Sequence, residues 1–455
     1  MFAKINFHDE FYQKLKLLVL PITMQQFMLA LVSATDAIML GAVSQTSLSA
    51  VSLAGQIQFV LNLFISGISA GSGIMAAQYW GKKDAASIEE VMPIALRTNL
   101  IFSGAFTVFA AVAPEVLMRI FTSDPALIES GAVYLRAVSL SYLLCGISQI
   151  YLILLKNTGY ATVSSRISCT AVVVNIICNA ILIYGLLGLP ALGIQGAAYA
   201  TVAARLVELI WSYLETKQSG RVQIIWKKMF RAADAVLTKD FWRYTTPVLG
   251  AALVWGIAYV SYSVIMGHMG SDAVAANSIT TIAKNMLSCL IRGVSGGAGV
   301  LIGNLLGAGE LDKAKVYGGR LARMAIVVGM TTGGLLMLIS PLIVRFAPLS
   351  ETAAEYLQYM LIFCGCNIMA QSVNTTVLDG IFCAGGDSKF DMKGNLGAMW
   401  CFSVPFGFFA AFVLKWPVMV VYCIVNLDEI VKIPAVYLHY KKYIWVRNIT
   451  VQEEA

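Results

Sequence analysis

The fold of this chain is decided by residues 17–81, which read LLVLPITMQQFMLALVSATDAIMLGAVSQTSLSAVSLAGQIQFVLNLFISGISAGSGIMAAQYWG. Asp36 is the one charged side chain in these 65 positions. Because a helix needs about 20 apolar residues to cross the core of a bilayer, the stretch predicts two membrane-spanning helices. The small, polar residues Ser44-Gln45-Thr46-Ser47 mark the break between them.

Asp36 therefore lies inside the first predicted span, where a carboxylate costs about 2.5–3.5 kcal/mol to insert. Two interpretations account for that cost. A protonated aspartic acid can form hydrogen bonds within a helix bundle, or the carboxylate can bind a proton or an ion as part of the protein's function. Because this acid stands alone in a long apolar stretch, we predict a coupling-ion or proton site at Asp36. We expect no metal beyond a sodium ion there.

The composition extends this interpretation to the whole chain. The sequence has 455 residues, of which 58% are hydrophobic and only 13% are charged, whereas soluble domains carry about 25% charged residues. We predict an all-α polytopic membrane protein with about twelve transmembrane helices, because lipid-exposed backbone must satisfy its own hydrogen bonds. The predicted spans are 15–41, 47–79, 92–113, 131–155, 165–187, 193–215, 243–267, 274–306, 318–343, 353–382, 394–414 and 417–440.

Lysine and arginine residues are unevenly distributed between the two sides of these spans. One side carries most of them, together with both termini. The basic residues that we assign to the C-terminal tail are Lys432, Lys441, Lys442 and Arg447. The basic residues on the other side are Arg119, Arg136, Arg345 and Lys415. Because positive loops stay in the cytoplasm, we predict a multi-pass protein of the plasma (inner) membrane with both termini cytoplasmic. Basic residues confined to loops do not indicate nucleic-acid binding.

The chain divides into two similar halves. Shifting the sequence by 226 residues places Pro21 on Pro247, Gly67 on Gly293 and Gly81 on Gly307 in one unbroken register. We predict two six-helix lobes, 1–215 and 243–455, joined by a basic amphipathic cytoplasmic linker at 216–242. Six spans per lobe give both halves the same orientation, so the repeat is parallel. Two such lobes leave a cleft between them and permit alternating access.

Several predicted spans carry polar residues on one helical face. The second span has Gln58 and Asn62, and its repeat partner has Lys284 and Arg292. Further candidates for the wall of a substrate cleft are Trp255, Tyr259, Tyr262, Asn367, Gln371 and Asn374. The neutral side chains can equally be contacts between helices, and the aromatic stripe can be packing. An aromatic stripe that faces the cleft would hold flat cations by stacking and cation–π contact.

Other classes of protein find little support in the sequence. The nine cysteines are scattered, and the three histidines lie far apart, so no disulfide framework or metal site is indicated. Gly385-Gly386-Asp387 is reminiscent of a protease motif but lies in a loop. We find no paired nucleophile and base and no phosphate-binding loop, so we predict that the protein is not an enzyme and needs no cofactor.

Four motifs in order carry a family resemblance. They are Asp36 to Gly41, Gly67 to Gly81 followed by Lys82-Lys83-Asp84, Gly307-Ala308-Gly309-Glu310, and Ala384 to Ser388. The chain resembles the multidrug and toxic compound extrusion (MATE) family, and its DinF-like branch in particular, over residues 13–440. The resemblance implies twelve helices in two lobes and export of organic cations driven by sodium or protons.

The resemblance also implies site residues. Asp36 is similar to the acid of the first helix that binds the coupling ion, and Asn175, Asn179 and Thr201 are similar to its polar neighbours. Where some relatives are acidic, this chain has Asn179. NorM-like members have a glutamate on the seventh helix, and this chain has Trp255, Tyr259 and Tyr262 there.

We therefore predict a secondary-active antiporter, acting as a monomer, that exports small organic and mainly cationic compounds in exchange for protons or sodium ions. The alternative within the superfamily is a flippase of lipid-linked saccharide, which would need a cationic cleft. For Lys284 three roles remain open: an ion pair with Asp379, binding of an anionic group on the substrate, or a fixed cation in place of a second coupling ion.

Overall fold

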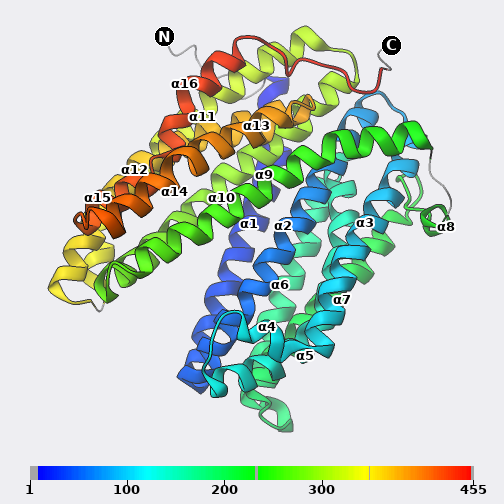
Figure 1. Ribbon diagram of the computed structural model, residues 1–455. Helices are drawn as coiled ribbons and strands as arrows, with labels where there is room; N and C mark the ends of the chain where they lie inside the picture. Colours follow the sequence, from blue (N-terminus) through cyan, green and yellow to red (C-terminus); the bar gives the residue numbers. More distant parts are fainter. Residues whose placement is uncertain (1–8, 231–233, 348, 452–455) are drawn as a thin grey trace. The chain divides into compact units, whose positions relative to one another are not determined.

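The computed structural model describes residues 9–230, 234–347 and 349–451 of the chain. The described residues form helices and no strands (Figure 1). The elements of the first half are α1 (Glu10–Val43), α2 (Gln45–Gly81), α3 (Ala85–Val112), α4 (Pro114–Arg119), α5 (Pro125–Asn157), α6 (Ala161–Tyr184), η1 (Leu186–Gly188), α7 (Gly193–Thr216) and α8 (Trp226–Met229).

The second half has a similar series of long helices, several of them broken. Its elements are α9 (Ala235–Gly267), α10 (Ser271–Gly307), α11 (Leu311–Phe346), α12 (Glu351–Thr375), η2 (Thr376–Phe382), α13 (Ser388–Asn395), η3 (Leu396–Ser403), α14 (Val404–Phe408), η4 (Phe409–Val413), α15 (Val418–Val425) and α16 (Asp428–Tyr440). η2 continues α12 as a π-helical segment, and η3 and η4 are π-helical parts of the run that begins with α13.

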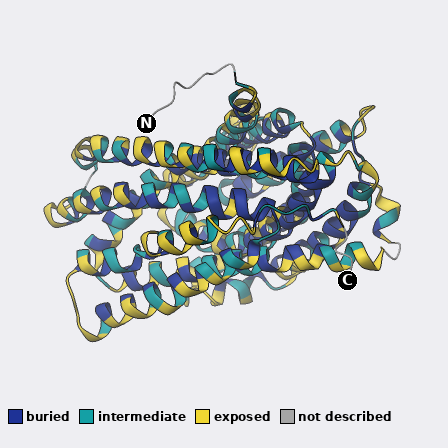
Figure 2. Cartoon of the chain, turned by 90° about the horizontal axis from the view of Figure 1, so that it is seen from above, coloured by how far each residue is buried: buried dark blue, intermediate teal, exposed yellow. Residues whose placement is uncertain are grey.

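The prediction of an all-α polytopic fold is confirmed. In the described ranges, ten helical stretches are long and apolar enough to cross a membrane. Most of these helices carry buried residues along one side and exposed residues along the other (Figure 2). Large apolar side chains such as Leu338 and Phe346 are among the exposed ones, as expected where the surrounding solvent is lipid.

Two of the twelve predicted spans are not among these ten. α7 covers the predicted span 193–215, but Arg205 and Glu208 lower its hydropathy. The predicted last span, 417–440, is two short helices, α15 and α16, which corrects the expectation of one continuous helix. Asp428 and Glu429 occupy the first turn of α16, where acidic side chains stabilise a helix start. A new helix therefore begins where the sequence suggested a continuous one.

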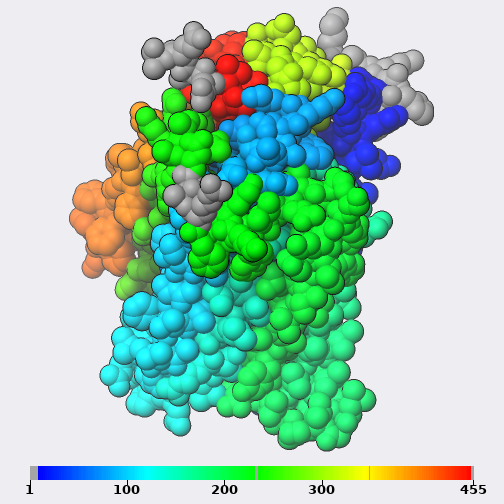
Figure 3. Space-filling model, turned by 90° about the vertical axis from the view of Figure 1, so that its right-hand side faces the viewer, coloured from blue at the N-terminus to red at the C-terminus, as the bar shows by residue number. Residues whose placement is uncertain are grey.

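The predicted linker 216–242 is shorter in the structure because α9 already begins at Ala235. Its described part is held against the first half of the chain. The indole nitrogen of Trp226 donates a hydrogen bond to the hydroxyl of Tyr151 at 2.7 Å, and Lys228 forms an ion pair with Glu90 at 2.6 Å. In Figure 3 this segment lies at the surface beside the start of α3.

Two compact units emerge, and their limits differ from the predicted lobe boundaries. One unit comprises the chain up to Gln26, Gly81–Lys83 and the residues from Gly250 onward, and the other comprises Phe27–Trp80 and Asp84–Leu249. α1 and α9 thus each contribute to both units. Phe11 and Leu15 of α1, for example, belong to the hydrophobic core around Leu306, Tyr317 and Trp445. The chain passes from one unit to the other after Gln26 in α1 and after Leu249 in α9. The 226-residue shift brings these two places in the sequence close to each other, which agrees with the internal repeat.

Within the unit that contains α11 and α12, glycines allow these two helices to pack closely. A methyl group on Gly329 would lie 2.9 Å from the β-carbon of Ser372, and one on Gly333 would overlap the backbone oxygen of Gly365. Small residues four positions apart are typical of close helix contacts in membranes. By contrast, a methyl group on the adjacent Gly334 would meet no atom within 4 Å.

We therefore expect Gly333→Ala to lower the thermal stability of the purified protein in detergent, because overpacking costs roughly 1–3 kcal/mol. Gly334→Ala is the matched control and should unfold at the wild-type temperature or slightly above it. Equal unfolding temperatures for the two variants would contradict the close contact between α11 and α12.

Candidate functional site

The four residues predicted around the coupling ion lie together in the unit formed by Phe27–Trp80 and Asp84–Leu249. Asp36 is on α1, Asn175 and Asn179 are on α6, and Thr201 is on α7. The amide of Asn179 donates to the Asp36 carboxylate at 2.5 Å and to the side-chain oxygen of Asn175 at 3.2 Å. The amide of Asn175 in turn contacts the hydroxyl of Thr201 at 3.5 Å. One chain of polar contacts therefore connects Asp36 to α6 and α7.

This site has an unusual charge balance. Asp36 is half-buried, and no described basic side chain lies close enough to interact with it. Asn179 is buried, and its side-chain oxygen accepts no hydrogen bond from the described residues. The site thus contains the carboxylate of Asp36, the amide oxygen of Asn179 and the nearby hydroxyl of Thr201. No described basic side chain balances these oxygens. Such a set suits a proton or a small hard cation, because hard cations prefer oxygen ligands.

A second acidic residue in the same unit is fully balanced. Glu208 of α7 is 2% exposed. It accepts hydrogen bonds from Ser148 at 2.9 Å and Gln149 at 3.2 Å, and it pairs with Arg205 at 2.7 Å. This group joins α7 to α5 and leaves no oxygen of Glu208 unused. Glu208 therefore serves helix packing, whereas Asp36 keeps its charge unbalanced.

The predicted polar faces of α2 and α10 each contain a half-buried and an exposed residue. On α2, Gln58 is half-buried and donates to the exposed Asn62 at 3.4 Å. On α10, Lys284 is half-buried and Arg292 is exposed, while Ser288 between them is buried. Both helices thus present polar side chains at their surface within apolar runs.

The aromatic stripe of α9 divides into two parts. The rings of Trp255 and Tyr259 stack with centroids 5.5 Å apart and an interplanar angle of 16°. Tyr262 packs instead against a hydrophobic core that includes Ile265 and Val421. Trp255 and Tyr259 therefore stack on each other, whereas Tyr262 takes part in helix packing, which was the alternative considered for the stripe.

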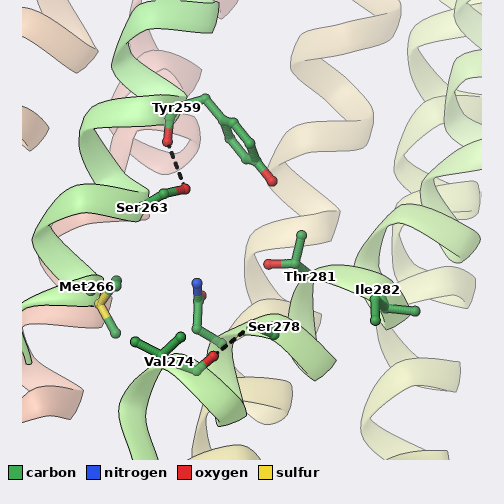
Figure 4. A pocket seen from close by; sticks show the side chains of 9 residues that line it. Tyr259, Ser263, Met266, Val274, Ser278, Thr281 and Ile282 are labelled. Carbon is green, nitrogen blue, oxygen red and sulfur yellow. Dashed lines mark hydrogen bonds between the residues drawn. The ribbon is translucent and has the colours of Figure 1, made fainter. Parts of the chain in front are cut away.

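A cavity of about 340 Å³ lies beside Tyr259 between α9 and α10. Figure 4 shows Tyr259 and Ser263 on one side of it and Val274, Ser278 and Thr281 on the other. Its lining residues are Tyr259, Ser263, Met266, Gly267, Val274, Asn277, Ser278, Thr281 and Ile282. Of the predicted cleft residues it contains Tyr259. None of the lining side chains is charged, so the cavity suits an uncharged or aromatic group.

The predicted polar face of α12 is largely turned inward. Asn367 is 2% exposed and donates to the backbone oxygen of Asn426, and Asn374 is 1% exposed and donates to the backbone oxygen of Glu429 at 2.6 Å. These amides satisfy backbone oxygens near the break between α15 and α16. Gln371 is half-buried, and its side-chain oxygen has no hydrogen-bond partner among the described residues.

Sequence reasoning missed a group of charges near this break. Lys432 of α16 is 6% exposed and pairs with Glu429 at 3.2 Å and Asp428 at 3.6 Å. It also donates to Asn395 at 3.2 Å, and Asn395 holds the carboxylate of Asp391 at 3.1 Å. Lys432 had been assigned to the cytoplasmic tail, and the structure corrects this assignment. The signal was present in the spacing of Asp428, Glu429 and Lys432, which places all three on one helical face.

The structure does not show the ion pair considered for Lys284 and Asp379. Asp379 is exposed on η2, and the described ion pairs of this region are made by Lys432 rather than Lys284. Lys284 lies within electrostatic range of Asp428 and Glu429, whereas Arg292 lies within range of Asp379. Two of the three roles considered for Lys284 therefore remain.

The described residues contain no group of three or more histidine, cysteine or acidic side chains that could hold a metal ion. A cation at Asp36 would therefore be held by one carboxylate together with the neutral oxygens of Asn175, Asn179 and Thr201.

Comparison with known proteins places this chain in a family. The MatE family model matches residues 21–181 and 247–409, once in each half. The chain is 22% identical to "Uncharacterized transporter YisQ" of Bacillus subtilis over 91% of its length and 90% of that protein. It is 24% identical to "Probable multidrug resistance protein NorM" of Bacillus cereus over 89% of its length and 90% of that protein.

A solved structure of a MOP superfamily transporter from Pyrococcus furiosus, described as having a binding pocket of reversed polarity, shares the fold. Its TM-score is 0.86 at 18% identity, with 95% of each chain covered. Because the family model covers most of the chain and matches each half separately, the protein belongs to the MATE family of membrane transporters.

Proposed function

We propose that this transporter is a secondary-active antiporter that exports organic compounds in exchange for protons or sodium ions. The observation that carries the proposal is the carboxylate of Asp36. Among the described residues it accepts a hydrogen bond from an amide of α6 at 2.5 Å, and no basic side chain balances it. Binding of a proton or sodium ion would neutralise this carboxylate and weaken its hydrogen bond to Asn179. Binding of the coupling ion would thus directly weaken the contact between α1 and α6.

The substrate class is proposed from aromatic and polar surfaces. Trp255 and Tyr259 stack on each other, and Tyr259 borders the uncharged cavity between α9 and α10. Flat organic cations bind favourably to such rings. The NorM proteins that this chain resembles carry the name of multidrug resistance proteins, which agrees with export of several drug-like compounds. We expect the monomer to act in the plasma (inner) membrane without a cofactor.

One observation favours a second candidate. The half-buried Lys284 and the exposed Arg292 give the polar face of α10 two positive charges. A flippase of lipid-linked saccharide would use such charges to bind the phosphates of its substrate. The unbalanced acid at Asp36 is better explained by ion coupling, so the antiporter is the first proposal.

The central test is Asp36→Asn, which removes the titrating group and nearly preserves its shape. In proteoliposomes with separately imposed sodium and proton gradients, this variant should insert normally and lose gradient-driven transport of a fluorescent cation. Asp312→Asn is the control, because the Asp312 side chain is 96% exposed and its pair with Lys315 is a surface contact. Wild-type transport by a well-expressed Asp36→Asn variant would refute the proposed site.

The role of Lys284 can be tested by combining Lys284→Met with Asp379→Leu. Because the two residues form no ion pair, their stability losses should add to within about 0.5 kcal/mol in detergent. Arg205→Met with Glu208→Leu is the positive control and should be strongly non-additive, since these residues pair at 2.7 Å. A coupling above about 1 kcal/mol between Lys284 and Asp379 would instead show that they interact.

Dye binding would then separate the two remaining roles of Lys284. If Lys284 binds an anionic group of the substrate, Lys284→Met should weaken binding of an anionic dye and leave a cationic dye unaffected. Unchanged binding of both dyes would count against that role.

The predicted orientation of the chain in the membrane follows from the unequal numbers of lysine and arginine residues in the loops on its two sides. Reporter fusions at Lys228 and Lys442 should both report the cytoplasm, and a fusion near Asp124 should report the outside. Lys228 is a useful test position because its ion pair with Glu90 holds it near the start of α3. An external signal at Lys228 would overturn both the proposed orientation and the two-lobe organisation.

A further inference from the structure

The cluster of charged side chains around Lys432 contains more acidic than basic residues. Three carboxylates, those of Asp391, Asp428 and Glu429, surround a single ammonium. Asp391 and Asp428 are buried to the same degree as Lys432, at 6%, 5% and 6% exposure. A buried charge is tolerated only where partners repay its loss of hydration. The position of Lys432 must therefore be set by these oxygens, and their charge must depend on the ammonium.

The ammonium of Lys432 stands where a bound cation would stand. It contacts a side-chain oxygen of Glu429 at 3.2 Å, of Asn395 at 3.2 Å and of Asp428 at 3.6 Å. These oxygens come from both α13 and α16. The second carboxylate oxygen of Glu429 accepts from Asn374 of α12 at 2.8 Å. The ammonium thus joins α16 to α13 through Asn395, while Asn374 joins α12 to α16 through Glu429.

A separate observation indicates that the surroundings of the Lys432 ammonium favour a positive charge. Asn374 is 1% exposed and donates to Glu429, yet its own side-chain oxygen has no hydrogen-bond partner among the described residues. A buried oxygen without a donor beside a cluster of carboxylates adds to the negative potential there. The described residues offer no metal site in this cluster, and the cation that its oxygens contact is the ammonium of Lys432.

We propose that Lys432 is a built-in cation of the second half of the chain. Its ammonium permanently fills an oxygen-lined position that would otherwise take a monovalent cation or protons. A tethered cation cannot be exchanged across the membrane, so this position joins α13 to α16 and transports no ion. If the proposed antiport function holds, ion coupling is left to Asp36 alone.

Other charges near the group agree with this role. Lys284 of α10 lies within electrostatic range of both Asp428 and Glu429. Arg292 and Lys432 lie within range of Asp379, which in turn is close to Asp391. Lys284 therefore supplies further positive charge to the same carboxylates without contacting them.

The test measures thermal unfolding in detergent, without substrate or gradient, so its result does not depend on transport. All variants carry Asp36→Asn, which removes the sodium response expected at the first site. Asp36→Asn alone should unfold at the same temperature in choline, potassium, sodium and lithium chloride. Adding Lys432→Met should lower the unfolding temperature in choline chloride at neutral pH. A small alkali cation or a lower pH should then restore part of the loss, because either one replaces the missing positive charge.

Three outcomes would overturn the proposal. The first is a double variant as stable in choline as Asp36→Asn alone, which would show that the ammonium is not needed. The second is a stability loss that neither alkali cations nor protons reduce, which would show that the position accepts no other cation. The third is a sodium-dependent unfolding temperature in Asp36→Asn alone, which would reveal a second exchangeable site. This last measurement uses a protein that retains Lys432. It therefore tests for a second exchangeable site even if the Lys432→Met protein fails to accumulate.

Discussion

A polar group in the hydrocarbon core of a bilayer must find its partner inside the protein, and this constraint explains most of the internal contacts of the chain. Glu208 is satisfied by Arg205, Ser148 and Gln149. Asn367 donates to the backbone oxygen of Asn426 at the break between α15 and α16, and Asn374 donates to the backbone oxygen of Glu429 in α16. Because water is absent, each such group fixes the helices that it joins.

Asp36 in the first half and the acidic cluster in the second half differ in whether a basic side chain contacts them. In the first half, Asp36 is bonded to Asn179 and has no described cation near it. In the second half, three carboxylates share an ammonium that belongs to the chain itself. A site without its own cation can gain and lose one during a transport cycle, whereas a site with a covalently attached cation cannot. Under the proposals made above, the first half of the repeat would exchange ions and the charged cluster of the second half would not.

The sequence was most informative where a residue stood alone against an apolar background. The helices followed from uninterrupted apolar runs, and Asp36 was recognisable because its surroundings contain no other charge. Its contacts with Asn179, and through Asn175 with Thr201, agree with the neighbours that the family resemblance implied.

Prediction failed where the outcome depended on contacts between distant segments. Lys432 was placed in the cytoplasm because a lysine near the end of a span usually marks the membrane surface. Its burial depends on Asn395, which lies 37 residues earlier. The sharing of α1 and α9 between the two compact units likewise has no local signal, because a continuous apolar helix looks the same whichever partners its two ends contact.

The distribution of charge also bears on what the second half can bind. Taken alone, Lys284 on the surface of α10 suggests a pocket that repels cations. Its electrostatic neighbours Asp428 and Glu429, together with Asp391, outnumber the two ammonium groups of Lys284 and Lys432. With all five groups ionised, the cluster carries net negative charge. A cationic aromatic compound on Tyr259 would therefore meet an interior that is not positive overall, so the presence of Lys284 is compatible with export of organic cations.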